Sequence, residues 1–215
     1  MFTKLAQEIR EHVNKPPINM ERYLKLYDNF DAAHDRRHVE TVRRYAMQLA
    51  EQHLADQKHK VDLAAVLHDI GLSKGRDRHE QYGADMVRSD KYLRRRFSAE
   101  EIEELANAVA RHRASTGDAQ TTLDKIISDA DRLSSENMLR RAYDYRLSHH
   151  PNMPDDYRIM EAAKHVKEKY GPGGRGTRTY FPQSADIIQG RSAPVITALN
   201  NNDMAQLRAL LEQEQ

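Results

Sequence analysis

The sequence predicts an all-α protein, and two kinds of observation support this. Apolar residues recur at helical spacing along most of the chain, whereas the period-two alternation that is typical of strands is missing. Signals for the start of a helix also precede several apolar stripes. Ser98 stands three residues before Glu101, and Asp77 stands three residues before Glu80. This is the spacing of a capping box, so we expect a helix to begin at each place.

The first predicted helices supply most of the core. Asp35 is the expected N-cap of a helix whose apolar stripe continues to Ala50. Residues 61–69 are almost entirely apolar up to their last two positions and predict a short buried helix. Apolar stripes over residues 102–109 and 123–130 predict two more helices. These segments should pack together as one bundle.

The later part of the chain is more polar. Residues 138–147 and 158–169 have helical spacing with fewer apolar positions, and residues 170–178 concentrate glycine and arginine in a predicted loop. Residues 203–211 form a short amphipathic helix, for which Asn202 or Asp203 is the cap.

This change in composition suggests where the chain divides. We assign residues 1–170 to one helical domain. Residues 171–215 are a Gly-rich basic loop and a short C-terminal helical extension, packed on the same domain.

Composition limits the function classes. The 215 residues are 39% hydrophobic, which suffices for one good-sized core, and the formal net charge of +1 argues against a nucleic-acid partner. Cysteine is absent, so any metal site must use His, Asp or Glu. Residues 1–8 lack the apolar core of a signal peptide and no later run could span a bilayer, so we expect a soluble cytoplasmic protein without a membrane partner. The sequence leaves open whether the protein forms a homo-oligomer.

Ionisable residues interrupt the apolar stripes. His68, for example, follows Ala64 by four residues and Val61 by seven, and therefore lies on a buried helical face. Burying several such groups without a common partner would cost several kcal/mol each, and one shared cation would compensate all of them. Imidazole and carboxylate donors suit Mn²⁺, Fe²⁺, Co²⁺, Ni²⁺ or Zn²⁺ better than Ca²⁺. The residues concerned are His38, His68, Asp69, His79, His112 and Asp131.

The order of these residues resembles the HD superfamily of metal-dependent phosphohydrolases, which is named for a paired His-Asp. The stretch Ala-Val-Leu-His-Asp-Ile-Gly around His68 matches that pair closely. The family also has an earlier His, matched by His38, and a later Asp, matched by Asp131 within Ala-Asp-Arg-Leu. Asp129 would then support a metal ligand or the fold and would not bind the metal itself. The resemblance covers roughly residues 30–135 and implies an HD-type helical bundle.

The resemblance also implies a ligand set. The expected metal ligands are His38, His68, Asp69 and Asp131. His79, in a His-x-x-x-Gly-Ala element, and His112 match two further family positions. These histidines either complete a second metal site or bind phosphate. The Gly-Tyr-Pro signature of the cyclic-dinucleotide branch is absent, which argues against that substrate.

The chemistry that the resemblance implies is hydrolysis of a phosphoester or phosphoanhydride of a nucleotide or related small molecule. A divalent cation lowers the pKa of its bound water to around 7, and Asp69 is expected to bind the metal and orient that water. Lys74 and Arg78 follow the His-Asp pair in a loop, where they would neutralise phosphate charge. Monoester, diester and pyrophosphate hydrolysis are left open. The alternative is a regulatory or ligand-binding HD module with a structural metal.

Overall fold

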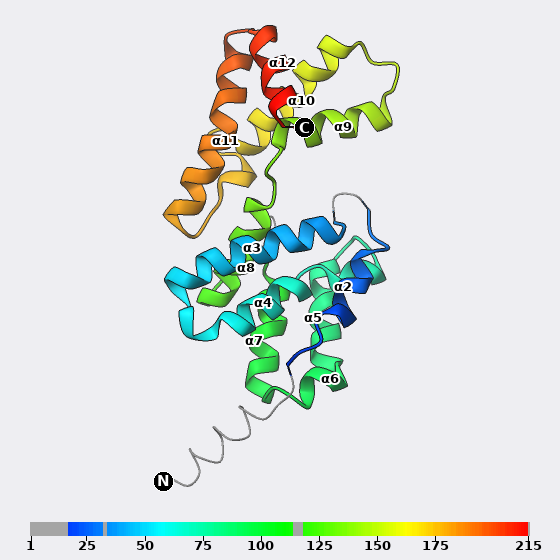
Figure 1. Cartoon of the computed structure of the whole chain (residues 1–215), viewed down its shortest axis with the longest axis vertical. Coiled ribbons are helices and arrows are strands. Elements are labelled where there is room, and N and C mark those ends of the chain that lie inside the picture. Colours follow the sequence, from blue (N-terminus) through cyan, green and yellow to red (C-terminus); the bar gives the residue numbers. More distant parts are fainter. Residues whose placement is uncertain (1–16, 32–33, 114–117, 215) are drawn as a thin grey trace.

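The computed structural model describes residues 17–31, 34–113 and 118–214, and over these ranges the protein is all-α, as the sequence predicts. Residues 1–8, on which the expectation about a signal peptide depends, lie outside them. The helices form two bundles arranged along the long axis of the molecule (Figure 1). Among the described residues, no helix combines the length and the apolar character that crossing a membrane requires.

The helices divide between the bundles in chain order. The first bundle contains α2 (Glu21–Tyr27), α3 (Arg36–His53), α4 (Lys58–Leu67), α5 (His79–Ser89), α6 (Lys91–Arg94), α7 (Ala99–Ala110) and α8 (Thr122–Leu133). The second bundle contains α9 (Met138–His149), α10 (Asp155–Tyr170), α11 (Pro182–Asn200) and α12 (Met204–Gln213). Three short 3₁₀ helices are η1 (Ala55–Gln57), η2 (Ile70–Lys74) and η3 (Arg175–Thr177).

The centre of the first bundle is α4. Its residues from Leu63 to Leu67 are completely buried, and the helix contacts α3, α7 and α8. The helix ends at Leu67, two residues earlier than the apolar run predicts, and His68 and Asp69 lie in the turn that leads into η2. The paired His-Asp therefore sits at the end of the most buried helix.

The N-caps test the sequence signals individually. The Asp35 carboxylate accepts hydrogen bonds from the main-chain N–H groups of Arg37 and His38, and Ser98 forms a complete capping box with Glu101, so both predictions are confirmed. The capping box predicted at Asp77 is wrong. Helix α5 begins at His79, and its N-cap is Arg78, whose φ of 60° is left-handed and whose side chain caps nothing.

Two glycines bring η2 against α5. A Cβ on Gly71 would lie 1.9 Å from the main-chain oxygen of His79 and 2.4 Å from the main-chain nitrogen of Gly83. Only a residue without a side chain fits such close approaches. The contact places the start of α5 directly beside the turn at Asp69.

The second bundle has its own apolar contacts. Helix α10 packs between α9 and α11, and Ile159, Ile188 and Leu207 are buried there. The sequence analysis did not identify α11, because Gly190 and Pro194 interrupt its pattern. The side chain of Asp203 caps α12, which selects one of the two predicted caps.

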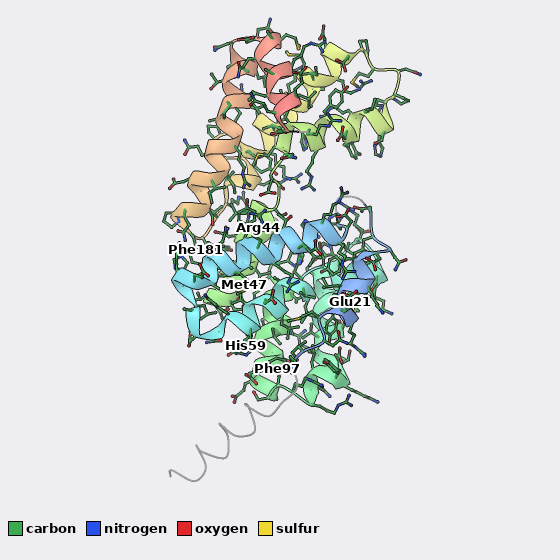
Figure 2. All side chains as sticks on the ribbon, viewed as in Figure 1. Glu21, Arg44, Met47, His59, Phe97 and Phe181 are labelled. Carbon is green, nitrogen blue, oxygen red and sulfur yellow. The ribbon has the colours of Figure 1, made fainter. Side chains whose placement is uncertain are left out.

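The bundles meet at α11. The ring of Phe181, just before α11, stacks on His53 of α3 with a centroid distance of 4.1 Å. Figure 2 labels Phe181 where α11 comes close to the first bundle. The Arg191 guanidinium donates to the main-chain oxygen of Leu133, at the end of α8. Helices α9 and α10, which lie within residues 1–170, thus pack with α11 and α12, which lie within residues 171–215. The domain boundary at residue 170 stays a prediction, because helix packing alone does not define an independently folding unit.

Candidate metal centre

Four imidazoles converge on the Asp69 carboxylate. The Nε2 atom of His68 lies 3.1 Å from Asp69 Oδ2, and that of His38 lies 3.5 Å from the same oxygen. On the other side, His79 Nε2 and His112 Nε2 lie 3.1 and 3.4 Å from Asp69 Oδ1. Asp69 thus faces two histidines with each of its oxygens.

The opposite nitrogen of three of these rings is held by the main chain. His68 Nδ1 is 2.8 Å from the oxygen of Ala65, and His112 Nδ1 is 2.7 Å from that of Val109. His79 Nδ1 is 3.0 Å from the oxygen of Arg76. A carbonyl can only accept, so each Nδ1 carries a proton and each Nε2 presents its lone pair to the centre.

The ring of His38 is fixed by Ser134. The Ser134 hydroxyl donates to the main-chain oxygen of Asp131 at 2.6 Å, and its oxygen lies 3.2 Å from His38 Nδ1. Because the hydroxyl proton is already used, the oxygen accepts from the Nδ1–H group. His38 therefore also directs Nε2 inward, where it lies 3.5 Å from Asp131 Oδ1.

The main chain of the His-Asp turn is held by Tyr27. The Tyr27 hydroxyl donates to the main-chain oxygen of Val66 at 2.8 Å and accepts from the N–H of Asp69 at 3.3 Å. Tyr27 itself is completely buried. Its position in the sequence carries no motif, so sequence reasoning did not identify it.

The electrostatics of the centre favour positive charge. Burial opposes ionisation of Asp69, but the surrounding imidazoles, His68 above all, outweigh burial and hold the pKa of Asp69 well below its usual range. Burial likewise opposes protonation of His68, but the adjacent Asp69 carboxylate raises the pKa of His68 to about 9. In the metal-free protein, a proton supplies the positive charge that this carboxylate attracts.

The donor set fits divalent cations. Two ligand groups each bring their donor atoms within 4.8 Å of one another: the first ligand group is His38, His68 and Asp131, and the second ligand group is Asp69, His79 and His112. Nε2 lone pairs only 3.1 Å apart, as in His38 and His68, repel one another unless a proton or a cation lies between them. The two groups, joined by Asp69, provide nitrogen and carboxylate donors for one or two transition-metal ions.

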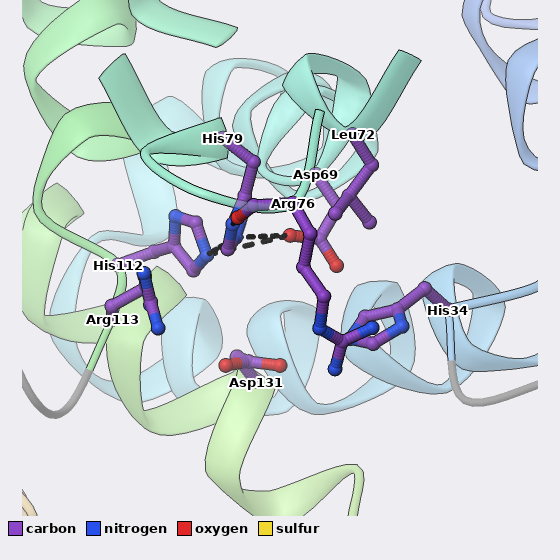
Figure 3. A pocket seen from close by; sticks show the side chains of 8 residues that line it. All are labelled: His34, Asp69, Leu72, Arg76, His79, His112, Arg113 and Asp131. Carbon is purple, nitrogen blue, oxygen red and sulfur yellow. Dashed lines mark hydrogen bonds and ion pairs between the residues drawn. The ribbon is translucent and has the colours of Figure 1, made fainter. Parts of the chain in front are cut away.

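A cavity of about 160 Å³ reaches this centre from solvent. Arg76 and Arg113 lie on two sides of the space between Asp69 and Asp131 (Figure 3). The remaining lining side chains are His34, Leu72, His79 and His112. A cavity with one apolar side chain, two guanidinium groups and several metal donors suits a small anionic group.

The predicted site residues fall into two sets. His38, His68, Asp69, His79, His112 and Asp131 all converge on the centre. Lys74 and Arg78 do not line the cavity; both side chains are exposed. Gly75 and Arg78 both have positive φ, and in the turn between them it is Arg76 whose side chain lines the cavity.

Asp129 and Asp131 have different surroundings. Asp131 lines the cavity and faces His38, whereas Asp129 is completely buried and accepts hydrogen bonds from the main-chain N–H groups of Tyr180 and Phe181 at 3.0 Å. The sequence analysis did not identify Arg76 and Arg113 as cavity residues. His34, four residues before His38, also lines the cavity, and the centroids of the two rings lie 5.7 Å apart.

Comparison with known proteins agrees with this geometry. Residues 36–136 match the family model described as the HD domain, and this range contains all six converging residues. Searches of the curated proteins and of the solved structures returned no match. The HD family consists mostly of metal-dependent hydrolases that bind divalent cations. This chain therefore carries an HD domain at residues 36–136, and its buried His/Asp cluster is consistent with the HD metal site.

Proposed function

We propose that this protein hydrolyses a phosphoester or phosphoanhydride bond of a nucleotide or a related small phosphorylated molecule. One observation carries the proposal: inward-facing metal donors lie at the base of a solvent-reaching cavity whose walls include two arginines. A purely structural metal site is closed by its protein ligands, whereas a catalytic site leaves a coordination position open. The cavity at Asp69 therefore favours catalysis over a structural role.

The cations would be held by the two ligand groups, with Asp69 between them. His38, His68 and Asp131 would hold one ion together with Asp69 Oδ2, and His79 and His112 would hold a second with Asp69 Oδ1. When bound, a divalent cation lowers the pKa of a coordinated water and polarises a phosphoryl oxygen. The Nδ1–H hydrogen bonds described above orient the rings for this purpose before any ion arrives.

The arginines bind the phosphate. Arg113 lies 3.2 Å from Glu80, and Arg76 lies 2.9 Å from Asp31. Each of these carboxylates orients its guanidinium without occupying all of its N–H donors, since a guanidinium has five. Arg76 and Arg113 are thus positioned to donate to two non-bridging oxygens of a phosphoryl group and to neutralise its charge.

His34 is placed to contact the substrate or a water molecule. Its Nδ1 is 2.7 Å from the Asp31 carboxylate, which leaves Nε2 available at the cavity wall. Asp31 therefore organises both His34 and Arg76 on one side of the cavity. This shared support should fix the direction in which the substrate phosphate enters.

The test begins with metal removal and reloading. The purified chain is stripped with a chelator, reloaded separately with Mn²⁺, Co²⁺, Ni²⁺ or Zn²⁺, and assayed against nucleotides, dinucleoside polyphosphates and simple phosphomono- and diesters. We expect turnover only after reloading. If no phosphoester is hydrolysed, and metal removal unfolds the protein, the regulatory module with a structural metal is the better description.

A further inference from the structure

His112 lies two residues beyond the end of α7, so its main chain depends on contacts outside that helix. Its carbonyl oxygen accepts a hydrogen bond of 2.7 Å from the hydroxyl of Ser128, on α8. Both residues are almost completely buried. Ser128 thus fixes the peptide that carries a member of the second ligand group.

The direction of this hydrogen bond is set by Arg132. One guanidinium nitrogen, Nη1, lies 3.0 Å from Ser128 Oγ and 3.1 Å from Asp129 Oδ1. A guanidinium can only donate, so the Ser128 oxygen accepts from it and the Ser128 proton is left for the carbonyl of His112. Arg132 therefore holds Ser128 in the rotamer that binds His112.

Asp129 connects Arg132 to the second bundle. Its carboxylate accepts from the main-chain N–H groups of Tyr180 and Phe181, which precede the first turn of α11. Asp129 is completely buried, and Arg132 is 8% exposed. Removing one partner of a buried Arg–Asp pair leaves the other charge buried without compensation. The position of Arg132 therefore depends on its contact with Asp129.

Tyr180 makes two further contacts between the start of α11 and the first bundle. Its hydroxyl accepts from the N–H of Ala119 at 3.1 Å, and its ring lies 5.7 Å from the Arg132 guanidinium. Ala119 is the second residue of the described segment 118–214, which follows His112 in the chain. The start of α11 thus contacts both the side chains that hold His112 and the segment downstream of it.

The first ligand group is supported differently: α11 reaches the neighbouring main-chain oxygen of Leu133 through Arg191, but among the described residues no hydrogen bond links Ser134 to the start of α11. There the corresponding hydroxyl is that of Ser134, which bonds His38 and the main-chain oxygen of Asp131, all between α3 and the end of α8. The two ligand groups are therefore supported differently. One serine holds each group, but only Ser128 is itself held through Arg132 and Asp129 by the start of α11, among the contacts of the described residues.

We propose that the start of α11 positions His112 through Asp129, Arg132 and Ser128, so that the second bundle sets the affinity of the second ligand group for its cation. This inference rests on the two-cation arrangement of the proposed function. Ser128 and Tyr180 are positioning residues in it, because neither touches a cation or the substrate. Substitutions that remove the support of a metal ligand typically weaken metal binding 10- to 100-fold.

The experiment measures Mn²⁺ binding to the full-length chain by calorimetry, with circular dichroism and thermal unfolding as checks of folding. Ser128→Ala should weaken one of two Mn²⁺ sites about 10- to 100-fold and leave the other unchanged, while Ser128→Thr, which keeps the hydroxyl, should restore most of the loss. Ser134→Ala is the matched control and should weaken the other site. Tyr180→Phe, at a partly exposed position, should weaken the same site as Ser128→Ala by a smaller factor.

A double-mutant cycle identifies the site that is affected. In a His112→Ala background, Ser128→Ala should cause no further loss of Mn²⁺ binding, because its partner is already gone. If a folded Ser128→Ala variant binds both ions as tightly as the parent, the inference is wrong although the proposed function stands. If the parent chain binds only one Mn²⁺, the two-cation arrangement itself is wrong. Equal weakening of both sites by Ser128→Ala would indicate a general structural role and would also overturn the inference.

Discussion

The two bundles bury ionisable side chains in opposite ways. In the first bundle, His68, Asp69 and His112 are almost completely buried and direct donor atoms at one another. In the second bundle, Arg158 is the one buried charged residue among the described residues of α9–α12. Its guanidinium donates to the main-chain oxygens of Pro151 and Met153. A buried guanidinium that donates to main-chain oxygens and to the Asp155 carboxylate holds a turn, whereas donors that face one another require a ligand.

Other charges of the second bundle form pairs near its surface. Arg208 pairs with Asp155 and Asp156, and Arg140 pairs with Asp144. Exposed pairs of this kind contribute little to stability, because water and salt screen them. The comparison therefore predicts that substitutions in the first bundle alter metal binding and catalysis. Substitutions in the second bundle, apart from the start of α11, should alter stability alone.

The largest effect is expected for Asp69→Ala. This substitution removes the carboxylate that faces all four imidazoles, so both proposed cation sites would lose a ligand. We expect kcat/KM to fall about a thousandfold, equal to about 4 kcal/mol of transition-state stabilisation. Steady-state kinetics of the variant, reloaded with Mn²⁺, measures kcat/KM. Asp155→Ala in the second bundle is the control and should stay within about twofold of the parent; a similar loss there would refute the contrast between the bundles.

The next largest effect is expected for Gly71→Ala. The added Cβ would lie 1.9 Å from the main-chain oxygen of His79, so η2 and α5 must separate. Displacing His79 from Asp69 should weaken the second cation site and lower kcat/KM by about 100-fold, because misplacement by about 1 Å costs that much. Calorimetric titration with Mn²⁺ reports the lost site. Unchanged binding of two ions by this variant would mean that the close approach does not position His79.

A smaller effect is expected for the cavity arginines. Arg76→Gln and Arg113→Gln each remove charge-assisted hydrogen bonds to phosphate, worth about 1.5–3 kcal/mol, so kcat/KM should fall about 10- to 100-fold. Lys74→Gln and Arg78→Gln are the matched controls, since both side chains are exposed and lie outside the cavity lining. If the controls lose more activity than the arginine variants, the substrate binds along the loop rather than in the cavity.

These two pairs of residues also show how far sequence reasoning extends. The six converging residues could be predicted because each falls within or at the end of an apolar stripe with helical spacing. That spacing indicates which side chains lie on the buried face of a helix. Arg76 and Arg113 could not be predicted in this way. Both lie between helices, where the direction of a side chain depends on backbone angles such as the positive φ of Gly75 and Arg78.

The helices show the same limit of prediction from the sequence. Helices with capped starts and clear stripes, such as α3 and α7, could be located from the sequence alone. Helix α11 could not, because Gly190 and Pro194 each disfavour a helix interior and only packing against α10 compensates for them. Tyr27 is a further example, since its contact with Val66 and Asp69 depends on the tertiary fold.

His68 in the first bundle and His165 in the second should respond to pH with opposite sign. In the metal-free protein, Asp69 raises the pKa of His68 from 6.5 to about 9. That interaction stabilises the fold fully below pH 6.5, and the stabilisation is lost as the pH rises toward 9. Burial, by contrast, lowers the pKa of His165 in α10, so His165 reduces stability as the pH falls below 6.5.

Urea unfolding in the presence of chelator measures both effects. The free energy of unfolding should decline between pH 6.5 and 9, and His165→Gln should remove part of the decline on the acid side only. With saturating Mn²⁺ the alkaline decline should disappear, because metal binding requires unprotonated Nε2 and improves over the same range. An alkaline decline of equal size with and without Mn²⁺ would indicate that His68 is not a metal ligand.

The smallest effect is expected for Gly190→Ala, in the middle of α11. A Cβ at this position meets no atom within 4 Å, and the residue is exposed. Alanine in a helix interior is more favourable than glycine by about 0.5–1 kcal/mol, so the free energy of unfolding should rise by that amount. Mn²⁺ binding and kcat/KM should not change, because the connection to His112 involves only the start of α11. If Mn²⁺ binding changes in this stabilised variant, α11 acts on the site along its whole length, and the second bundle is part of the catalytic unit rather than a support for one of its ligands.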